Sequence, residues 1–254
     1  MGVSSPIFSD NTFEFIQIDD YYSSSKKTYH DFPSKYSRYG KTLADFLPST
    51  EANRHIHPDP DFKNFTYDQY VARDTPRSKI FENLEEGNIL FFVCSMAFYN
   101  EAAYKDRDNK IKYYQSGKRH KYIFGFFTIT GVAEVTISKD DIKITTLSGV
   151  IDPKIINQVP GYERDLKKLR CKNRLYLVVG DPKKSALLIR AIRLTKRWAK
   201  YTYILNNFGR TILQRKKDNI RGFRWVNDER LIKMIFKKIH LPNPELINKM
   251  KDYL

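Results

Sequence analysis

The stretch KYIFGFFTITGVAEVTI, residues 121–137, combines aromatic and β-branched residues with two glycines, Gly125 and Gly131. Aromatic and β-branched side chains favour extended backbone, because they pack well on a pleated surface. A glycine inside such a run marks a bulge or a tight bend. We therefore predict two strands here, or one long strand broken at Gly125 or Gly131.

Two further segments have the composition of buried strands. ILFFVCSM, residues 89–96, and NRLYLVVGD, residues 173–181, are almost continuously apolar over the length of a strand. A continuous apolar run, without alternation, is typical of a strand that is buried on both faces. Together with residues 121–137, these segments predict a curved and largely mixed sheet.

The residues that follow this last strand have the pattern of an amphipathic helix. Asp181 is a helix-capping residue, and Pro182 fits the first helical position. At about 100° per residue, five basic side chains fall on one narrow arc of this helix. These are Lys183, Arg190, Arg193, Arg197 and Lys200. Two more helices are predicted, at 227–240 and from residue 243.

These elements predict an α+β fold class. The fold is a curved mixed β-sheet or a small barrel, followed by a basic helical C-terminal region. We expect residues 1–160 to form a mixed-sheet core with loop excursions. Residues 161–254 then form a basic strand and helix region that completes the same domain.

The net charge of +16 is unevenly distributed along the chain. Residues 161–254 contain 25 Lys and Arg against 8 Asp and Glu, a balance of +17. Residues 1–160 contain the other 20 and 21, a balance of −1. Such an asymmetry favours a polyanionic partner, most often nucleic acid, over a merely solvated basic face.

Basic and aromatic residues interleave at Arg221, Arg224 and Trp225. Aromatic rings stack on unpaired bases, and adjacent cationic groups contact phosphates. We therefore include these three residues, with the five of the predicted helix arc, among the candidate nucleic-acid-binding residues. The alternative for each ring is ordinary packing in the core or at its rim.

The segment RHIHPDPDFKNFTYD, residues 54–68, alternates His55, His57, Asp59 and Asp61. In extended backbone these side chains face one way, and their nitrogen and oxygen atoms suit Zn, Mn or Fe. A divalent metal is therefore the candidate cofactor. We favour a second interpretation, in which the aspartates bind local amides in a turn, and Phe62 and Phe65 anchor that turn in the core.

A third interpretation remains open for the same segment. His57 and Asp59 can line a nucleotide pocket without a metal, so His57, Asp59 and Asp61 are the candidate catalytic residues. A nuclease would need two carboxylates and a lysine around a metal, and Asp61 with Asp141 and Lys143 supplies those types.

Other compositional features bound the class of protein. Cys94 and Cys171 lie in unlike surroundings, so neither a disulfide framework nor a cysteine metal cluster is predicted. No apolar run has the length of a membrane span, roughly 18–20 residues. We expect a cytoplasmic protein without a membrane partner. The oligomeric state is not indicated.

Five blocks of sequence occur in a recognisable order: SSPIFSDNTFEFIQI, HPDPDFKNFTYD, LEEGNILFFV, YIFGFFTITGVAEV and LYLVVGDPKKSALLIRAI. Together they resemble the third of the nucleotide-modification-associated domain families of prokaryotes and phages. The resemblance runs from about residue 3 to residue 195 and implies a role linked to nucleotide modification. Gln17 and Asp19 replace prolines of the family pattern. Asn88 replaces an aspartate, and a carboxylate of the family pattern has moved or been lost near Asp68.

Two of these blocks, LEEGNILFFV and YIFGFFTITGVAEV, are also similar to the sheet signature of PUA-like modules of the ASCH, EVE and YTH group. That similarity implies a small curved barrel that binds RNA or modified bases. The leading hypothesis is therefore recognition of nucleic acid, including a modified base, linked to nucleotide modification. The alternatives are a metal-dependent nuclease or base-modifying enzyme, and a basic protein with a structural role on ribosomal or other RNA.

Overall fold

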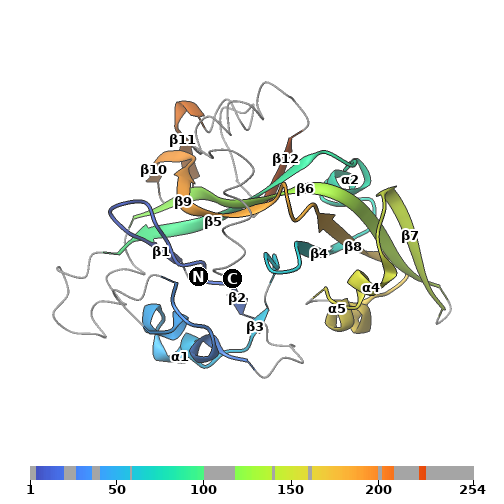
Figure 1. Cartoon of the computed structure of the whole chain (residues 1–254), viewed down its shortest axis with the longest axis horizontal. Coiled ribbons are helices and arrows are strands. Elements are labelled where there is room, and N and C mark those ends of the chain that lie inside the picture. The colour runs from blue at the N-terminus through green and yellow to red at the C-terminus, as the bar shows by residue number, and fades with distance from the viewer. Residues whose placement is uncertain are drawn as a thin grey trace.

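The computed structural model describes most of the chain as one arrangement of strands with short helices (Figure 1). The described residues are 4–19, 27–35, 41–57, 59–99, 118–138, 141–159, 162–199, 202–208 and 223–226. The predicted helices at 227–240 and from residue 243 lie outside these ranges.

One strand, β6 (Arg119–Ser138), is 20 residues long and forms the spine of the main sheet. Its first half pairs on opposite sides with β5 (Ile89–Phe98) and β9 (Ala186–Arg193), both antiparallel. Its second half pairs with β7 (Asp141–Gly149) and β8 (Asn173–Gly180), also antiparallel. Residues 121–137 are therefore one long strand rather than two.

Three more strands complete this eight-stranded sheet. β4 (Thr66–Ala72) pairs antiparallel with β8. β1 (Ser5–Ile7) pairs parallel with β5, and β12 (Phe223–Val226) pairs antiparallel with the same strand. The sheet is mixed, as predicted, but it is open, because β1 and β4 end the order of pairing and do not pair among the described residues. The predicted PUA-like barrel is therefore not what these strands form.

Both glycines of β6 lie beside irregularities of pairing, as predicted. Phe124 is the extra residue opposite β5, directly before Gly125. Thr130 is the extra residue opposite β8, directly before Gly131. A Cβ at Gly125 would lie 2.3 Å from Cζ of Phe62, so the absence of a side chain lets the 59–66 segment pack on the strand. The bulges and the close packing explain why β6 bends (Figure 1).

The segment predicted to be a basic helix is instead strand β9 followed by β10 (Thr195–Ala199), and this prediction was wrong. Leu188, Ala191 and Ile192 are buried at helix-like spacing. The spacing arises from a bulge, because Leu187 pairs with Gly125 while Ile192 already pairs with Ile123. The described part of the last third is thus mainly strand, and its predicted helical character is not seen there.

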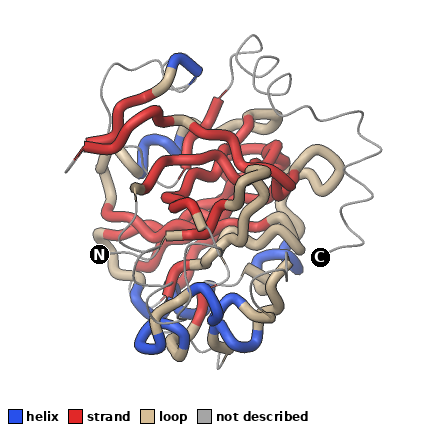
Figure 2. Tube along the Cα trace, turned by 90° about the vertical axis from the view of Figure 1, so that its left-hand side faces the viewer, coloured by secondary structure: helices blue, strands red, loops and turns tan. Residues whose placement is uncertain are grey.

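The remaining elements are short. Two small antiparallel pairs are β2 (Ile18–Asp19) with β3 (Ile56–His57), and β10 with β11 (Thr202–Leu205). The helical segments are η1 (Tyr29–Asp31), η2 (Leu43–Phe46), α1 (Ser49–Ala52), α2 (Ser78–Glu82), α4 (Pro153–Ile156) and α5 (Tyr162–Lys168). Figure 2 shows how little of the trace is helical beside the strands.

The two faces of β8 are covered by different helices. Phe81 of α2 stacks on Tyr176 with ring centroids 5.2 Å apart. Leu175 and Leu177 point the opposite way, since side chains alternate along a strand, and they pack with Ile156 and other residues of the α4–α5 region. The sheet is therefore the middle layer of the molecule at this end.

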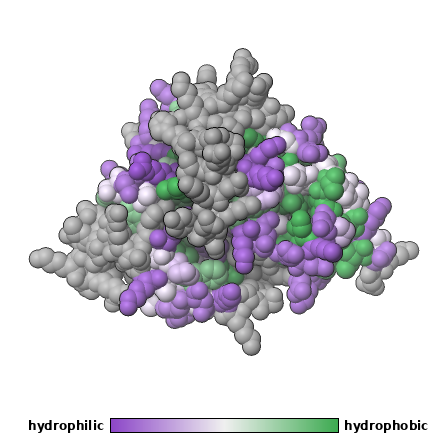
Figure 3. Space-filling model, in the orientation of Figure 1, coloured by the Kyte–Doolittle hydropathy of each residue, from purple (hydrophilic) through white to green (hydrophobic). Residues whose placement is uncertain are grey.

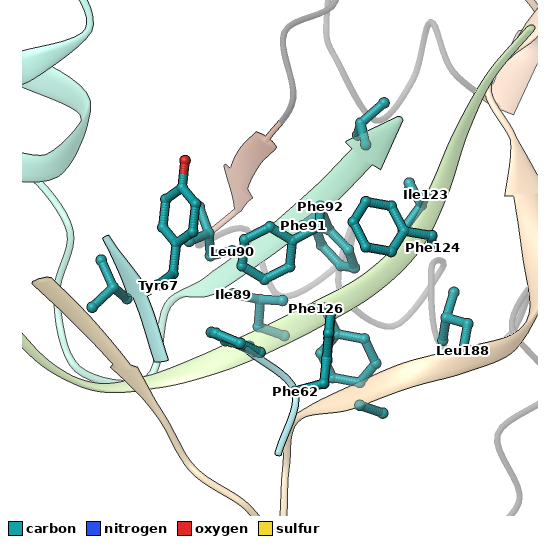
Figure 4. Close-up of a cluster of buried hydrophobic side chains, with 14 of the residues drawn as sticks. Phe62, Tyr67, Ile89, Leu90, Phe91, Phe92, Ile123, Phe124, Phe126 and Leu188 are labelled. Atoms are coloured by element: carbon teal, nitrogen blue, oxygen red, sulfur yellow. The ribbon is translucent and has the colours of Figure 1, made fainter. Parts of the chain in front are cut away.

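The main core is built largely from aromatic rings (Figure 4). Phe62 lies with its ring centroid 5.6 Å from that of Phe92 and 5.2 Å from that of Phe127. Phe92 and Phe127, from β5 and β6, are 4.7 Å apart. Edge-to-face contacts of this kind add stability beyond the burial of area, about 0.5–1.5 kcal/mol per pair.

Strand β7 differs from the others because almost all of its side chains are exposed. Ile142, Ile144 and Leu147 are large apolar residues among them, and Val150 follows with 79% of its surface exposed. Figure 3 shows apolar surface on the side of the molecule where β7 lies. Lys143 and the bulge at Leu147 are features that discourage an edge strand from pairing with another chain.

Candidate functional site

The histidine and aspartate segment begins in β3 and ends in β4. His55 is exposed and forms a bridge with Thr28, while the backbone of His57 pairs with Ile18 in β2. Asp59 is buried, with 8% of its surface exposed. His55 and Asp59 thus lie in different environments, and the side chain of His57 is outside the described part of the structure.

Asp61 binds the backbone of its own turn. Its Oδ1 accepts hydrogen bonds from the amides of Lys63, at 2.7 Å, and Asn64, at 3.3 Å. Its Oδ2 accepts from the Asn64 side chain at 2.8 Å. Phe62 and Phe65 are buried on either side of these residues. These hydrogen bonds are those expected from the turn interpretation, and they involve both oxygens of the Asp61 carboxylate.

Asp59 meets a second buried acid that sequence reasoning did not select. Asp61 and Thr66 pair through both backbone hydrogen bonds, so Asp59 comes opposite Asp68. The Asp68 amide donates to Oδ1 of Asp59 at 3.4 Å, and Asp68 is only 3% exposed. The signal in the sequence is the pair of acids Asp59 and Asp68 on either side of PDFKNFTY, residues 60–67, which contain a turn.

Three polar residues surround this acid pair, and we call the whole group the Asp59 cluster. Its members are Asp59, Tyr67, Asp68, Gln69 and Arg77. The Tyr67 hydroxyl donates to Oε1 of Gln69 at 2.7 Å, and Nη2 of Arg77 donates to the same oxygen. The cluster joins β4 to the start of α2.

Burial raises the pKa of Tyr67 well above its ordinary value of 10, and the negative charge of Asp59 adds to the effect. The charge of Arg77 acts in the opposite direction. The phenol therefore remains protonated at neutral pH and acts as a hydrogen-bond donor. Buried titratable groups with shifted pKa values occur often at functional sites, although structural networks also contain them.

The described residues do not provide a set of ligands for the metal interpretation. No group of three or more His, Cys, Asp or Glu side chains there is placed to hold a metal ion. Asp59 and Asp68 are oxygen donors of the kind that suit a hard divalent cation. Of the predicted nuclease residues, Asp61 is engaged in its turn and Asp141 is exposed at the start of β7.

A second group of candidate functional side chains lies where β6 begins and β9 ends. Tyr122 pairs with Arg193, the Leu194 amide donates to the carbonyl of Lys121 at 2.8 Å, and the Lys121 amide donates to Oγ1 of Thr195 at 3.0 Å. These contacts join two basic segments into what we call the basic end. Its cationic residues are Lys118, Arg119, Lys121, Arg190, Arg193 and Lys196.

The candidate nucleic-acid-binding residues are distributed more widely than the predicted helix arc implied. Arg190 and Arg193 are exposed on β9, and Lys183 lies in the turn before it, where its amide donates to Oδ1 of Asp181 at 2.8 Å. Arg197 lies in β10, and Arg224 and Trp225 lie in β12, with side chains outside the described part. Lys200 and Arg221 are outside it altogether.

Sequence reasoning did not select His120, Lys121 or Lys196 as binding residues. The available signal was the run Lys118–Lys121, four consecutive basic side chains at the start of a strand. This run becomes a candidate binding segment only because β9, with its own basic residues, lies beside it. Only the pairing of β6 with β9 reveals that neighbour.

The strands and short helices define an α+β protein with an open mixed sheet. The chain belongs to the nucleotide modification associated domain 3 family, whose model matches residues 1–236. This confirms the family resemblance seen in the five blocks of sequence. No curated protein and no solved structure matches the chain. The similarity to PUA-like modules is not confirmed.

No helix in the described residues has both the length and the apolar character needed to cross a membrane.

Proposed function

We propose that this protein binds nucleic acid through the basic end, in a role linked to nucleotide modification. The observation that carries the proposal is that the pairing of β6 with β9 brings six Lys and Arg residues to one end of the sheet. The sequence around them reinforces the charge, since residues 182–217 contain no Asp or Glu. Membership of the nucleotide modification associated family is compatible with such a partner.

Electrostatics explains why this surface favours a polyanion. Each phosphate that a Lys or Arg neutralises releases condensed counterions, so affinity falls steeply as salt rises. Exposed arginines and lysines on strands also keep their side chains available for phosphate oxygens. Recognition of a modified base is the finer form of the proposal, and it rests on the family's association with nucleotide modification.

Fluorescence anisotropy with labelled single-stranded DNA, double-stranded DNA and RNA tests the proposal. The variant replaces Arg190, Arg193 and Lys196 by Ala. If each contacts one phosphate of duplex DNA, the slope of log affinity against log salt becomes less steep by about 2.7. Oligonucleotides with cytosine, 5-methylcytosine or 5-hydroxymethylcytosine test base recognition in the same assay.

The matched control replaces three exposed lysines outside the basic end by Ala. They are Lys63, Lys79 and Lys154. The control removes the same formal charge but leaves the basic end intact, so the salt slope should remain close to that of the wild type. Equal losses in the two variants would show that net charge, rather than this surface, is responsible, and would count against the proposal.

The Asp59 cluster favours a second candidate function, a reaction on a nucleotide or base. Two buried carboxylates beside a tyrosine and an arginine are costly to bury, and such groups are typical of sites that move protons or hold a metal. Labelled DNA incubated with Mg²⁺ or Mn²⁺ should then be cleaved or altered. Asp59→Asn should abolish the change while nucleic-acid affinity remains.

A further inference from the structure

We infer that Arg193 is a preformed phosphate subsite, with His120 as its positioning residue. The inference rests on the proposed function and deepens it, because it names the group that contacts a phosphodiester. The basic end is then more than a diffuse region of positive charge. One guanidinium in it is held in a fixed orientation.

The orientation of Arg193 follows from its hydrogen bonds. Nε donates to the carbonyl of Thr195 at 2.5 Å, and Nη2 donates to the carbonyl of Lys196 at 2.9 Å. Nη2 also lies 2.7 Å from Nε2 and 3.1 Å from Nδ1 of His120. A guanidinium has five N–H donors, and these contacts use three of them. Within the described residues no acceptor binds the two N–H groups of Nη1.

His120 acts as an acceptor for Arg193 rather than as a further cation. Burial, together with the charges of Arg193 and Lys118, lowers the pKa of His120 from 6.5 to about 4. The ring is therefore neutral at pH 7, with one nitrogen able to accept. Its Nδ1 also lies 3.2 Å from Oγ1 of Thr195, which places the imidazole between β6 and the residues after β9.

The backbone beneath the guanidinium is held as well. The side-chain amide of Asn206 donates to the carbonyl of Arg193 at 2.7 Å, and the backbone amide of Asn206 donates to that of Leu194 at 2.9 Å. Oγ1 of the buried Thr195 accepts from the Lys121 amide. These contacts order the segment before any ligand binds, so little conformational entropy is lost on binding.

The exposed Nη1 group suits the oxygens of a phosphate. Arg193 is exposed at the surface, and its charge is carried on a planar group with two donors directed away from the protein contacts. Lys196 follows Arg193 by three residues and Lys118 precedes His120 by two, so both add positive charge to this part of the protein. Hydrogen bonds from a charged donor to an anion are stronger than neutral ones, and a fixed donor makes them selective in geometry.

Arg190 provides the matched comparison on the same strand. It is exposed, it has the same charge, and no acceptor among the described residues binds its guanidinium. If only charge matters, Arg193→Lys and Arg190→Lys should weaken nucleic-acid binding equally and slightly. If Arg193 is a preformed subsite, Arg193→Lys removes the oriented guanidinium and causes a large loss of affinity. Arg190→Lys then causes only a small loss.

The experiment measures affinity for one labelled oligonucleotide at pH 7.5 and several salt concentrations. We expect Arg193→Lys to bind about ten-fold more weakly than the wild type, with an unchanged salt slope because the charge is kept. Arg190→Lys should lose about two-fold at most. Equal losses in the two variants overturn the subsite and leave the proposed function intact.

Two substitutions of His120 test its positioning role without changing net charge. His120→Ala removes the acceptor, and His120→Gln keeps one in its amide oxygen. The Ala variant should lose affinity by about three- to ten-fold, the loss of a modest hydrogen bond, and the Gln variant should recover most of it. Circular dichroism melts check that each variant is folded. If the Ala and Gln variants bind with equal affinity, the positioning role of His120 is overturned. If the wild type binds no oligonucleotide, both proposals are overturned.

Discussion

The contact between Gly125 and Phe62 predicts a strong coupling between two distant parts of the chain. A Cβ at position 125 would lie 2.3 Å from Cζ and 2.5 Å from Cε1 of Phe62, and 3.0 Å from the carbonyl oxygen of Ala186. Carbon atoms in contact are about 3.5–4.0 Å apart. In Gly125→Ala the Phe62 ring must therefore move by more than about 1 Å. Phe92 and Phe127 close that space, with ring centroids 5.6 and 5.2 Å from that of Phe62.

The size of the coupling free energy follows from the cost of each single substitution. Overpacking of a closed core costs about 1–3 kcal/mol, which is our estimate for Gly125→Ala. Phe62→Ala removes a buried ring and costs about 3–5 kcal/mol. In the double variant the new methyl group occupies space that the ring has left. The combined loss should then be smaller than the sum of the single losses by about 1–3 kcal/mol.

Equilibrium unfolding in urea measures these free energies, with two spectroscopic probes to check that the transition is two-state. Gly87→Ala is the control, because Gly87 has a φ of +83° and a Cβ added there would meet no atom within 4 Å. It should cost only backbone strain, about 1–2 kcal/mol, and should add to Phe62→Ala without coupling. Additivity of Gly125→Ala with Phe62→Ala to within about 0.5 kcal/mol would refute the packing explanation.

Three further predictions concern polar groups. Asp61→Ala should lower the free energy of unfolding by about 1 kcal/mol without changing nucleic-acid affinity, because the carboxylate serves its own turn. Thr66→Val should raise the melting temperature, because Oγ1 of Thr66 is buried and has no hydrogen-bond partner among the described residues. The folded-state pKa of His120 is about 4 against 6.5 for a free imidazole, so the unfolded chain binds a proton first as pH falls. His120 should therefore reduce stability between pH 6.5 and 4, and His120→Gln should flatten that part of a pH-dependent melting curve.

The central strands could be predicted from the sequence because their apolar character is continuous. ILFFVCSM at 89–96 forms most of β5, and residues 173–180 form β8. Both are largely buried on both faces. Gly125 and Gly131 also indicated where the long strand departs from regular pairing. In each case the physical cause is local, a run of side chains or a missing one.

The prediction of a basic helix at 183–200 was wrong because the pairing of this segment with β6 is not visible in its local sequence pattern. Leu188, Ala191 and Ile192 have helical spacing, but a bulge opposite β6 produces the same spacing in β9. Pairing with a long neighbouring strand outweighs helix propensity, which is weak and easily overridden. Asp181 caps a turn rather than a helix for the same reason.

The sequence by itself determined the composition of the molecule, its family, its basic last third and the positions of its buried strands. Only the tertiary structure decided which polar residues meet. Arg193 and His120 are 73 residues apart and come together because β9 lies beside β6. Asp59 reaches Asp68 because the backbone of Asp61 pairs with Thr66. Strand pairing is made by backbone groups that every residue carries, so the identity of a strand's neighbour leaves little trace in its own side chains.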